Sequence, residues 1–383
     1  MRVAIIQDNI GPGGRIVVII SMIEIMNELN IIPDIFTFSF KLSKEDIEKK
    51  YGKTIQFNLK RIPLNIFKKF PEINKIFINS LMTFYYNKYD LFIDSNNTTC
   101  LMSKKIKKIL SYTYFPRKRR IKNKEAIREF SNKSLLSKIA IKFDYFIAGL
   151  FYAKDCIKNN TEIITLSEFS RKEIGNIYNI DQMKIKIVYP PVDISAFSPN
   201  KKKTKSVSTI GRFAPQKKQL EQIKIAKELP ELEFNIMGFA EEDDPYFLTC
   251  KKYIEKNKIS NVILHRSIDY KKMINILERS KYFLHTLYNE PFGITTVQGI
   301  AAGCIPIVPN SGGQIEIVPI DSLRFDDISE VVTIIRDVEE KDFNEELAIL
   351  YNNIERFSEN SFKKSFKLLF LKIIGEFTNR KFS

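Results

Sequence analysis

The stretch LHTLYNEPFGITTVQGIAAGCIPIVPNSGG, Leu284 to Gly313, has the order strand, loop, helix, strand and loop. Its apolar start is typical of a buried strand, and a helix is expected from Ile294 to Ala302, closed by Gly303. A second apolar strand and a second glycine loop follow this helix. Because parallel strands are usually joined by a crossover helix, the stretch predicts one unit of a parallel α/β sheet.

Strands and helices alternate in this way on both sides of one linker, residues 185–205, which combines prolines with a lysine run. The pattern predicts two doubly wound, Rossmann-like α/β domains with parallel sheets. Ligands are then expected at the carboxyl ends of the strands, in a cleft between the domains. We expect an N-terminal domain over 1–195, a second domain over 196–358, and a C-terminal helix in 359–383 that packs back toward the first. The expected strands are Val3–Ile6, Ile35–Phe40, Leu91–Ile93, Ile109–Tyr114 and Ile163–Leu166 before the boundary, and 206–213, 233–238, 261–265, 282–287 and 304–309 after it.

The composition restricts the class of protein. With 383 residues, 44% of them hydrophobic, the chain has enough apolar material for two cores. The formal charge of +16, from 61 Lys and Arg against 45 Asp and Glu, implies an anionic partner such as a phosphate ligand, a membrane surface or nucleic acid. The four cysteines lack C-x-x-C spacing, which favours reduced, buried thiols. Because neither a signal peptide nor a membrane-spanning apolar stretch is evident, a cytoplasmic location is expected.

The loop between the first strand and the helix of the opening stretch suits a phosphorylated ligand. A helix N-terminus offers unpaired backbone N–H groups and the positive end of the helix dipole, and Gly293 lets a ligand approach the backbone. Glu290 can accept hydrogen bonds from hydroxyls on one side of a diphosphate, and Gln298, about 12 Å further along the helix, from hydroxyls on the other. This layout matches a nucleoside diphosphate sugar. The alternative is a buried helix with an incidental carboxylate and amide.

Two further strand ends favour the ligand interpretation. The segment STIGRFAPQKK ends an earlier strand and places Arg212 and Lys217 at equivalent positions of the sheet. Arg offers a planar fork for phosphate oxygens and Lys a point charge, so both can neutralise a leaving diphosphate. An ordinary solvated turn is the alternative for this segment. The second loop, PNSGG, also follows a strand and precedes a helix, and three such sites at equivalent strand ends are unexpected by chance.

A family resemblance rests on these motifs. Leu284–Val318 resembles the nucleotide-sugar motif of retaining GT-B glycosyltransferases of family 4, in which Glu, seven residues and a second Glu are followed by AAG and SGG. The branch that adds mannose to lipid-linked oligosaccharides on the cytoplasmic side of a membrane is the most similar. Its motifs resemble LHTLYNE with FGI, YPPVD at Tyr189–Asp193, FIDSNNTT at Phe92–Thr99 and SYTYFP at Ser111–Pro116.

The resemblance implies transfer of a hexose, with retention of the anomeric configuration, from a nucleotide sugar to a glycan or lipid-linked acceptor. GDP-mannose is the expected donor and UDP-glucose the alternative, with no cofactor and no metal. Glu290, Arg212 and Lys217 would be catalytic, and Tyr114 and Asp94 would contact acceptor or sugar. The implied donor-binding residues are Gly13, Gly14, Arg212, Lys217, Glu290, Phe292, Gly293, Ile294 and Gln298. Because the leaving diphosphate helps to deprotonate the acceptor, no second carboxylate is required, unlike in glycosidases.

The sequence departs from the family pattern at two positions. Gln298 stands where the family has its second Glu; an amide keeps one acceptor, so ribose binding is expected to survive with a loss on the order of 1 kcal/mol. Tyr114 stands where the family usually carries a His, and its ring suits either a sugar contact or the core. The chain has only two histidines, His265 and His285, and we expect His285 to lie in the core.

Ten Lys or Arg residues lie between Lys104 and Lys124, interleaved with aromatic residues. The centre of this segment is a basic patch, Arg117, Lys118, Arg119 and Arg120. This patch can dock on an anionic membrane or hold a lipid diphosphate. A solvated cationic face is the alternative.

Three other classes of function are alternatives to a glycosyltransferase. A nucleic-acid-binding protein would fit the charge but leaves the Glu290 layout unexplained, so no nucleic acid is expected. An oxidoreductase that binds a nicotinamide through GPGG would need G-x-G-x-x-G spacing, which is absent. An epimerase or a catalytically silent binding protein of the same fold stays open.

Overall fold

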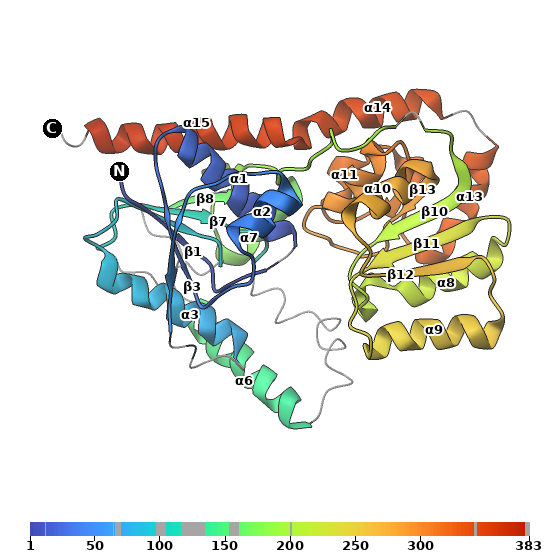
Figure 1. Ribbon diagram of the computed structural model, residues 1–383, viewed down its shortest axis with the longest axis horizontal. Coiled ribbons are helices and arrows are strands. Elements are labelled where there is room, and N and C mark those ends of the chain that lie inside the picture. The colour runs from blue at the N-terminus through green and yellow to red at the C-terminus, as the bar shows by residue number, and fades with distance from the viewer. Residues whose placement is uncertain are drawn as a thin grey trace. The chain divides into compact units, whose positions relative to one another are not determined.

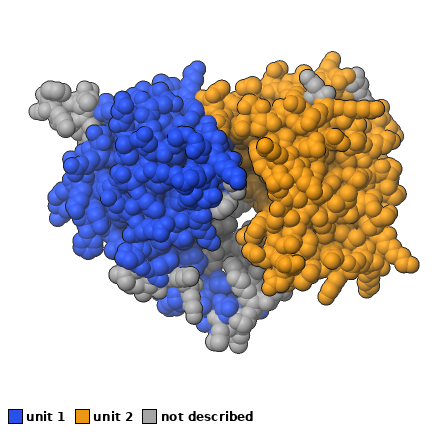
Figure 2. Space-filling view, viewed as in Figure 1, with its two compact units in different colours: residues 1–191, 362–383 blue, residues 192–361 orange. Residues whose placement is uncertain are grey.

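The structure is a computed structural model that describes residues 1–11, 13–63, 65, 70–96, 105–116, 135–152, 161–199, 201–340 and 343–379. The chain forms two compact units. Unit 1 comprises Met1–Pro191 and Phe362–Ser383, and unit 2 comprises Val192–Ser361 (Figure 2). The chain passes from unit 1 to unit 2 within the linker of prolines and lysines.

Unit 1 contains a seven-stranded sheet of order β5-β3-β1-β6-β7-β8-β9 in which every neighbouring pair is parallel. A separate two-stranded sheet pairs β2 with β4. The strands are β1 (Val3–Ile6), β2 (Asn9–Ile10), β3 (Asp34–Thr37), β4 (Ser39–Phe40), β5 (Asn58–Arg61), β6 (Leu91–Asp94), β7 (Ile109–Tyr112), β8 (Thr161–Thr165) and β9 (Ile185–Ile187). The helices are α1 (Gly14–Glu28), α2 (Lys44–Tyr51), α3 (Pro71–Leu81), η1 (Met82–Tyr85), α6 (Leu135–Tyr152), α7 (Glu168–Tyr178), η3 (Gln182–Lys184) and α15 (Glu359–Asn379).

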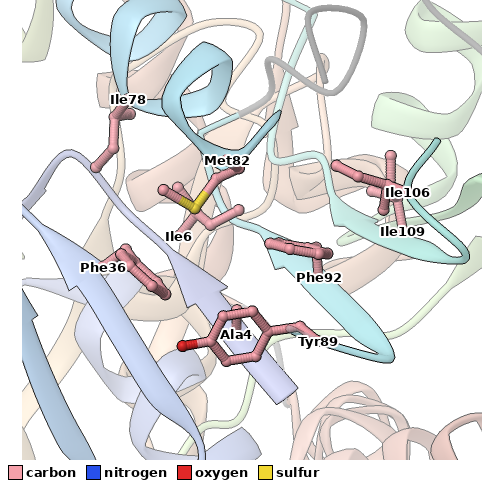
Figure 3. Packing of buried hydrophobic residues seen from close by; sticks show 9 residues of the cluster. All are labelled: Ala4, Ile6, Phe36, Ile78, Met82, Tyr89, Phe92, Ile106 and Ile109. Atoms are coloured by element: carbon pink, nitrogen blue, oxygen red, sulfur yellow. The ribbon is translucent and has the colours of Figure 1, made fainter. Parts of the chain in front are cut away.

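Helices cover both faces of this sheet, with α3 and α6 on one side and α1 and α15 on the other (Figure 1). Alternate residues of β1 point to opposite faces. Ala4 and Ile6 face α3 and belong to a buried hydrophobic cluster, shown in Figure 3. The cluster consists of Ala4, Ile6, Phe36, Ile78, Met82, Tyr89, Phe92, Ile106 and Ile109. Since helices cover both faces of the sheet, the sequences of the central strands are continuous apolar runs.

The C-terminal helix α15 belongs to unit 1 from Phe362 onward. Its buried face carries stacked phenylalanine rings four residues apart, Phe362, Phe366 and Phe370. Its polar side makes two ion pairs with α1, Lys363 with Glu24 at 2.8 Å and Lys367 with Glu28 at 2.9 Å. The last helix of the chain is thus held against the first.

Unit 2 contains a six-stranded parallel sheet of order β12-β11-β10-β13-β14-β15. Helices α8 and α9 lie on one side of it and α10 and α11 on the other (Figure 1). The strands are β10 (Thr204–Ile210), β11 (Glu233–Gly238), β12 (Val262–Arg266), β13 (Ser280–Leu284), β14 (Ile305–Pro309) and β15 (Arg324–Phe325). The helices are η4 (Pro215–Lys217), α8 (Gln219–Glu228), α9 (Pro245–Asn257), α10 (Tyr270–Arg279), α11 (Ile294–Ala301), α12 (Gln314–Ile317), η5 (Asp321–Leu323), η6 (Ile328–Glu330), α13 (Val331–Glu339), α14 (Asn344–Ile354) and η7 (Glu355–Phe357).

The two predicted doubly wound parallel sheets are therefore confirmed, and the strand predicted over 35–40 differs in one detail. The Thr37 hydroxyl donates hydrogen bonds to the carbonyl oxygens of Asp8 and Ser39, each at 3.0 Å. Because these bonds turn the chain at Phe38, the segment is divided between β3 and β4. Cys250 and Cys304 are buried free thiols, as expected; Cys100 and Cys156 lie outside the described residues.

Candidate functional site

The loop after β13 places Glu290 at the carboxyl ends of the strands of the unit 2 sheet. His285 still pairs with the sheet, since its backbone N–H donates to the carbonyl oxygen of Ile307 at 2.9 Å. The chain then turns through Asn289, whose φ of 53° is left-handed, a region that Asn tolerates better than most residues. Gly293, at φ 135°, ends the loop and is the N-cap of α11. Only glycine adopts that conformation readily, so the loop dictates this residue.

Glu290 and Lys217, two of the residues predicted to be catalytic, lie together in the structure. The ammonium Nζ of Lys217 is 2.7 Å from Oε2 of Glu290. Both side chains are about three-quarters buried, with exposed fractions of 26% and 23%. Lys217 belongs to the loop after β10 and Glu290 to the loop after β13, and these two strands are neighbours in the sheet. The sheet order therefore explains their meeting.

Two polar side chains hold the Lys217 loop in place. The Thr286 hydroxyl donates to the backbone carbonyl oxygen of Lys217 at 2.7 Å. The Gln222 amide in turn donates to the Thr286 hydroxyl oxygen, also at 2.7 Å. Thr286 and Gln222 are each only 2% exposed, so these bonds are shielded from water and fix the Lys217 backbone beside the Glu290 loop.

The second glycine loop packs directly on the backbone of the first. A Cβ atom added to Gly312 would lie 2.5 Å from the carbonyl oxygen of Glu290, and one added to Gly313 would lie 2.7 Å from Cα of Phe292. The Gly313 N–H donates to the Glu290 carbonyl oxygen at 2.9 Å. These glycines thus serve close packing between the loops, and that packing holds the Glu290 backbone in place.

The first turn of α11 has no side-chain cap at Gly293. The N–H groups of Ile294 and Thr295 precede the first bonded N–H of the helix, that of Thr296, which donates to the Gly293 carbonyl oxygen at 3.0 Å. The Gln314 side chain lies against Gly293; its Oε1 accepts from the Thr296 hydroxyl at 2.8 Å, whereas its Nε2 has no partner among the described residues. Ile294 is the first residue of the helix and half-buried, while the ring of Phe292 is buried against Phe357.

His285 lies behind the ion pair, buried as expected. Its Nε2 is 3.7 Å from Oε2 of Glu290, and its exposed fraction is 3%. Burial, and after it the Lys217 charge, lower the pKa of this imidazole to about 4, although Glu290 and the Leu287 backbone act to raise it. The ring is therefore neutral near pH 7.

The other predicted residues of unit 2 lie on the same elements. Gln298 is half-buried on α11, and its side chain is hydrogen-bonded to the Tyr270 hydroxyl, whose pKa burial raises to about 12. Arg212 follows β10 directly and is exposed. Its carbonyl oxygen accepts a hydrogen bond from Gln219 at 3.0 Å, and no ion pair of its guanidinium is found within the described part of the chain.

The predicted residues of unit 1 lie at the carboxyl ends of β1, β6 and β7. Gly13, at φ 141°, and Gly14 open α1 and are exposed. Tyr114 is half-buried; its hydroxyl is 3.1 Å from that of Ser95. Burial raises the pKa of this phenol. The hydrogen bond with Ser95 and the charge of Arg15 lower the same pKa, but by less.

Asp94 is fully buried, and its Oδ1 accepts from the Asn79 amide at 3.2 Å and from the Asn96 N–H at 2.9 Å. The basic patch, Arg117, Lys118, Arg119 and Arg120, lies outside the described residues. Within those residues, no helix is both long and apolar enough to cross a bilayer. The same part of the chain holds no cluster of three His, Cys, Asp or Glu side chains suited to a metal ion.

Three side chains of the site were not predicted from the sequence: Thr286, Gln222 and Gln314. Thr286 alternates with His285 along the strand, and a polar residue at the carboxyl end of a buried strand is a usable signal for a site. Gln222 and Gln314 stand on helices among other polar residues, where nothing in one sequence distinguishes a buried amide from an exposed one.

Known protein families match part of the chain. Residues 193–353 match the family described as "Glycosyl transferases group 1". A GDP-Man:Man(3)GlcNAc(2)-PP-Dol alpha-1,2-mannosyltransferase of Mus musculus is 30% identical over 205 residues, which are 48% of this chain and 40% of that protein. The Homo sapiens protein of the same name is 28% identical over 200 residues, 46% and 39% of the two chains. The chain thus aligns with less than half of the length of these relatives.

Solved structures match over nearly the whole chain. A glycosyltransferase from Rickettsia africae has a TM-score of 0.69 at 15% identity and covers 97% of this chain and 98% of its own. Anabaena HepE in complex with UDP-glucose has a TM-score of 0.69 at 14% identity and covers 97% and 100%. The chain therefore has the GT-B fold, two Rossmann-like units with parallel sheets, and over residues 193–353 it is similar to the group 1 glycosyl transferases.

Proposed function

We propose that the protein is a retaining glycosyltransferase of family 4 that transfers a hexose, with mannose favoured, from a nucleotide diphosphate donor to a glycan or lipid-linked acceptor. One observation carries this proposal: Lys217 and Glu290 meet at neighbouring strand ends, next to the uncapped N-terminus of α11, inside the region that matches the glycosyl transferase family. A cation, a carboxylate and open N–H groups in one place suit a sugar diphosphate.

The chemistry follows from the charges of this site. The bond between the hexose and the diphosphate breaks as negative charge develops on the leaving phosphate oxygen. Lys217, Arg212 and the first N–H groups of α11 stabilise that charge, the kind of electrostatic stabilisation that usually contributes most to catalysis. Glu290 accepts hydrogen bonds from hexose hydroxyls, and Gln298 binds the ribose. Phe292 and Ile294 shape the loop that holds the donor.

Retention follows if the acceptor attacks from the side that the diphosphate leaves. The departing phosphate oxygen then takes the acceptor proton, so the site needs one carboxylate instead of the pair that glycosidases use. In the described part of unit 2, Lys217 and His285 are titratable neighbours of Glu290.

GDP-mannose is the donor that we propose, because the curated relatives carry GDP-Man in their names. UDP-glucose is the alternative. A thermal-shift screen with GDP-, UDP- and ADP-sugars tests the proposal, since a ligand that binds only the native state raises the melting temperature by mass action. A shift with GDP-mannose alone supports mannosyl transfer, a shift with UDP-glucose alone supports the alternative, and no shift with any of them contradicts a nucleotide-sugar site.

For unit 1 we propose roles in binding the acceptor and part of the donor. Gly13 and Gly14 would approach the donor, and Tyr114 would hydrogen-bond a sugar hydroxyl. Asp94, which is buried and engaged by Asn79 and Asn96, would act by holding the end of β6. Tyr114→Phe distinguishes a sugar contact from a core role: the contact predicts a higher KM with unchanged stability, and the core role the reverse.

We also propose a peripheral position on the cytoplasmic face of a membrane. Helix α6 has an inner side fixed by Asp144, whose carboxylate accepts from the N–H groups of Glu72 and Ile73 at 3.0 and 2.9 Å. Its outer side exposes apolar residues, Ile139, Phe143 and Phe146, each more than half exposed, next to the exposed Lys142. The preceding residues 117–134 contain eight Lys or Arg and two Glu. Exposed apolar side chains beside cations are complementary to an anionic bilayer.

Sedimentation with phosphatidylserine vesicles tests this surface. Phe143→Ser with Phe146→Ser, and separately Arg117, Arg119 and Arg120→Ala, should each abolish binding to the vesicles. Phe239→Ser, which removes an equally exposed aromatic from unit 2, is the matched control and should bind normally. Unchanged sedimentation of both sets of variants would refute the membrane surface without affecting the proposal for the donor.

A further inference from the structure

His285 is the buried group of the site to which the proposed reaction gives no role. It stands directly after β13, and its imidazole Nε2 is 3.7 Å from Oε2 of Glu290. The exposed fraction of the side chain falls from 26% for Lys217 and 23% for Glu290 to 4% for His285. The imidazole thus forms the floor of the site beneath the ion pair.

The protonation state of this ring can be deduced. Burial holds it neutral, with a pKa of about 4, so it carries one N–H. Nε2 is buried and has no hydrogen-bond partner among the described residues, although Oε2 of Glu290 lies 3.7 Å away. The ring proton is assigned to Nδ1, toward the Leu287 backbone, and this assignment leaves Nε2 as an acceptor.

An unprotonated Nε2 has a specific requirement. It cannot donate to the carboxylate of Glu290, and two lone pairs 3.7 Å apart do not attract each other. A buried acceptor without a hydrogen bond is costly, and such atoms in a native protein often mark a place that a ligand completes. What this atom lacks is a donor, such as a hydroxyl group.

We propose that Nε2 of His285 accepts a hydrogen bond from one hydroxyl of the donor hexose, while Glu290 accepts from the neighbouring hydroxyl. Two acceptors 3.7 Å apart can each take a proton from adjacent hydroxyls of one ring. The diphosphate of the donor draws Lys217 away from Glu290, and the parting of this ion pair opens the path to Nε2. The inference rests on the proposed function and adds to it a residue that selects between hexoses.

The test combines changes in the protein with changes in the sugar. Dissociation constants are measured by calorimetry for GDP-mannose and its four monodeoxy analogues, first with the wild-type protein. His285→Phe keeps a flat ring of similar shape without the acceptor, and His285→Asn keeps an acceptor on a shorter side chain. A site that binds a hydroxyl discriminates strongly against the analogue that lacks it. One analogue should therefore bind about tenfold more weakly than GDP-mannose, the equivalent of one hydrogen bond.

The same hydroxyl should lose its effect in the variant. In His285→Phe, GDP-mannose and that one analogue should bind with equal affinity, while the penalties for the other three analogues persist. His285→Asn should restore part of the difference. His265→Asn, which changes the only other histidine, is the matched control and should keep the wild-type pattern.

Two negative results have different meanings. If the wild-type protein binds the donor and all four penalties are the same in His285→Phe, the role of His285 is wrong and the proposed function stands. If the wild-type protein binds none of the donors, UDP-glucose included, the proposed function itself fails. Because the comparison is made within each variant, a general loss of affinity in His285→Phe leaves the test valid.

Discussion

The ammonium of Lys217 and the carboxylate of Glu290 are 2.7 Å apart although 73 residues separate them in the sequence. The sheet order places β10 beside β13, and each of the two residues follows one of these strands. A donor diphosphate would compete with Glu290 for the Lys217 charge, so we expect donor binding to weaken the ion pair.

Replacing Lys217 by Ala should lower kcat/KM about a hundredfold, the usual effect of losing one group that stabilises a developing anion. The unfolding free energy should fall by only about 1 kcal/mol, because a partly exposed ion pair contributes little to stability. Steady-state kinetics and urea unfolding measure the two effects. Lys218→Asn is the matched control: it removes the adjacent cation, keeps a residue that tolerates the left-handed backbone there, and should change kcat/KM about twofold or less. Equal losses in both variants would contradict a specific role.

Gln298→Glu should keep or improve the affinity for the donor, because a carboxylate accepts hydrogen bonds from both ribose hydroxyls. The protonated Tyr270 hydroxyl, which now pairs with Gln298, can donate to the new carboxylate. The donor KM measures the effect, with Gln298→Leu as the control that removes every acceptor and should raise KM. A large rise of KM in Gln298→Glu would count against contact with the ribose.

Gly313→Ala should destabilise unit 2 by about 1–3 kcal/mol, because the new Cβ would overlap the backbone of Phe292 and cannot be relieved by moving a side chain. Donor affinity should fall with it, since the same contact holds the backbone of the Glu290 loop. In Gly375→Ala a methyl group is added on α15 with no atom within 4 Å, which should stabilise by about 0.5–1 kcal/mol. Urea unfolding of both variants is the measurement, and equal destabilisation would show that the loop contact has no special weight.

His285 should make the stability of the protein sensitive to acid. Its folded-state pKa of about 4 lies below the ordinary value of 6.5, so the unfolded chain takes up the proton first as the pH falls. The contribution is complete above pH 6.5 and is lost as the pH falls through about 4, up to about 3 kcal/mol in total. Unfolding free energies at pH 7 and 4.5 should therefore differ more in the wild type than in His285→Phe. The same pH dependence in both proteins would contradict a buried neutral imidazole.

Much of the fold follows from the sequence, because buried parallel strands are continuous apolar runs. Val3–Ile6 and 233–238 are strands at the predicted boundaries. Three edge strands were not predicted: β5, with the polar sequence NLKR, and the three-residue β9 in unit 1, and the two-residue β15 in unit 2. Each lies at one end of its sheet, where one side has no neighbouring strand. Their pairing depends on the strand beside them, which local sequence does not reveal.

The candidate site, like the fold, was predicted only in part. The strand-loop-helix order identified Glu290 and Lys217, because residues at the carboxyl ends of adjacent parallel strands meet at one edge of a sheet. The short distance between His285 and Glu290 could not be predicted from the sequence. It depends on the turn through Asn289 and on Gly312 and Gly313, which belong to a later loop and pack against this one. The roles of Thr286 and Gln222 depend likewise on contacts between distant segments.

Calorimetric titration with GDP and with guanosine tests most directly whether Arg212 and Lys217 bind the diphosphate. In the wild-type protein GDP should bind far more tightly than guanosine, and the double variant Arg212→Ala with Lys217→Ala should lose at least about a hundredfold in affinity for GDP while its weak affinity for guanosine stays the same. An unchanged dissociation constant for GDP in that variant would contradict the account, because the two cations would then have no part in holding the phosphates.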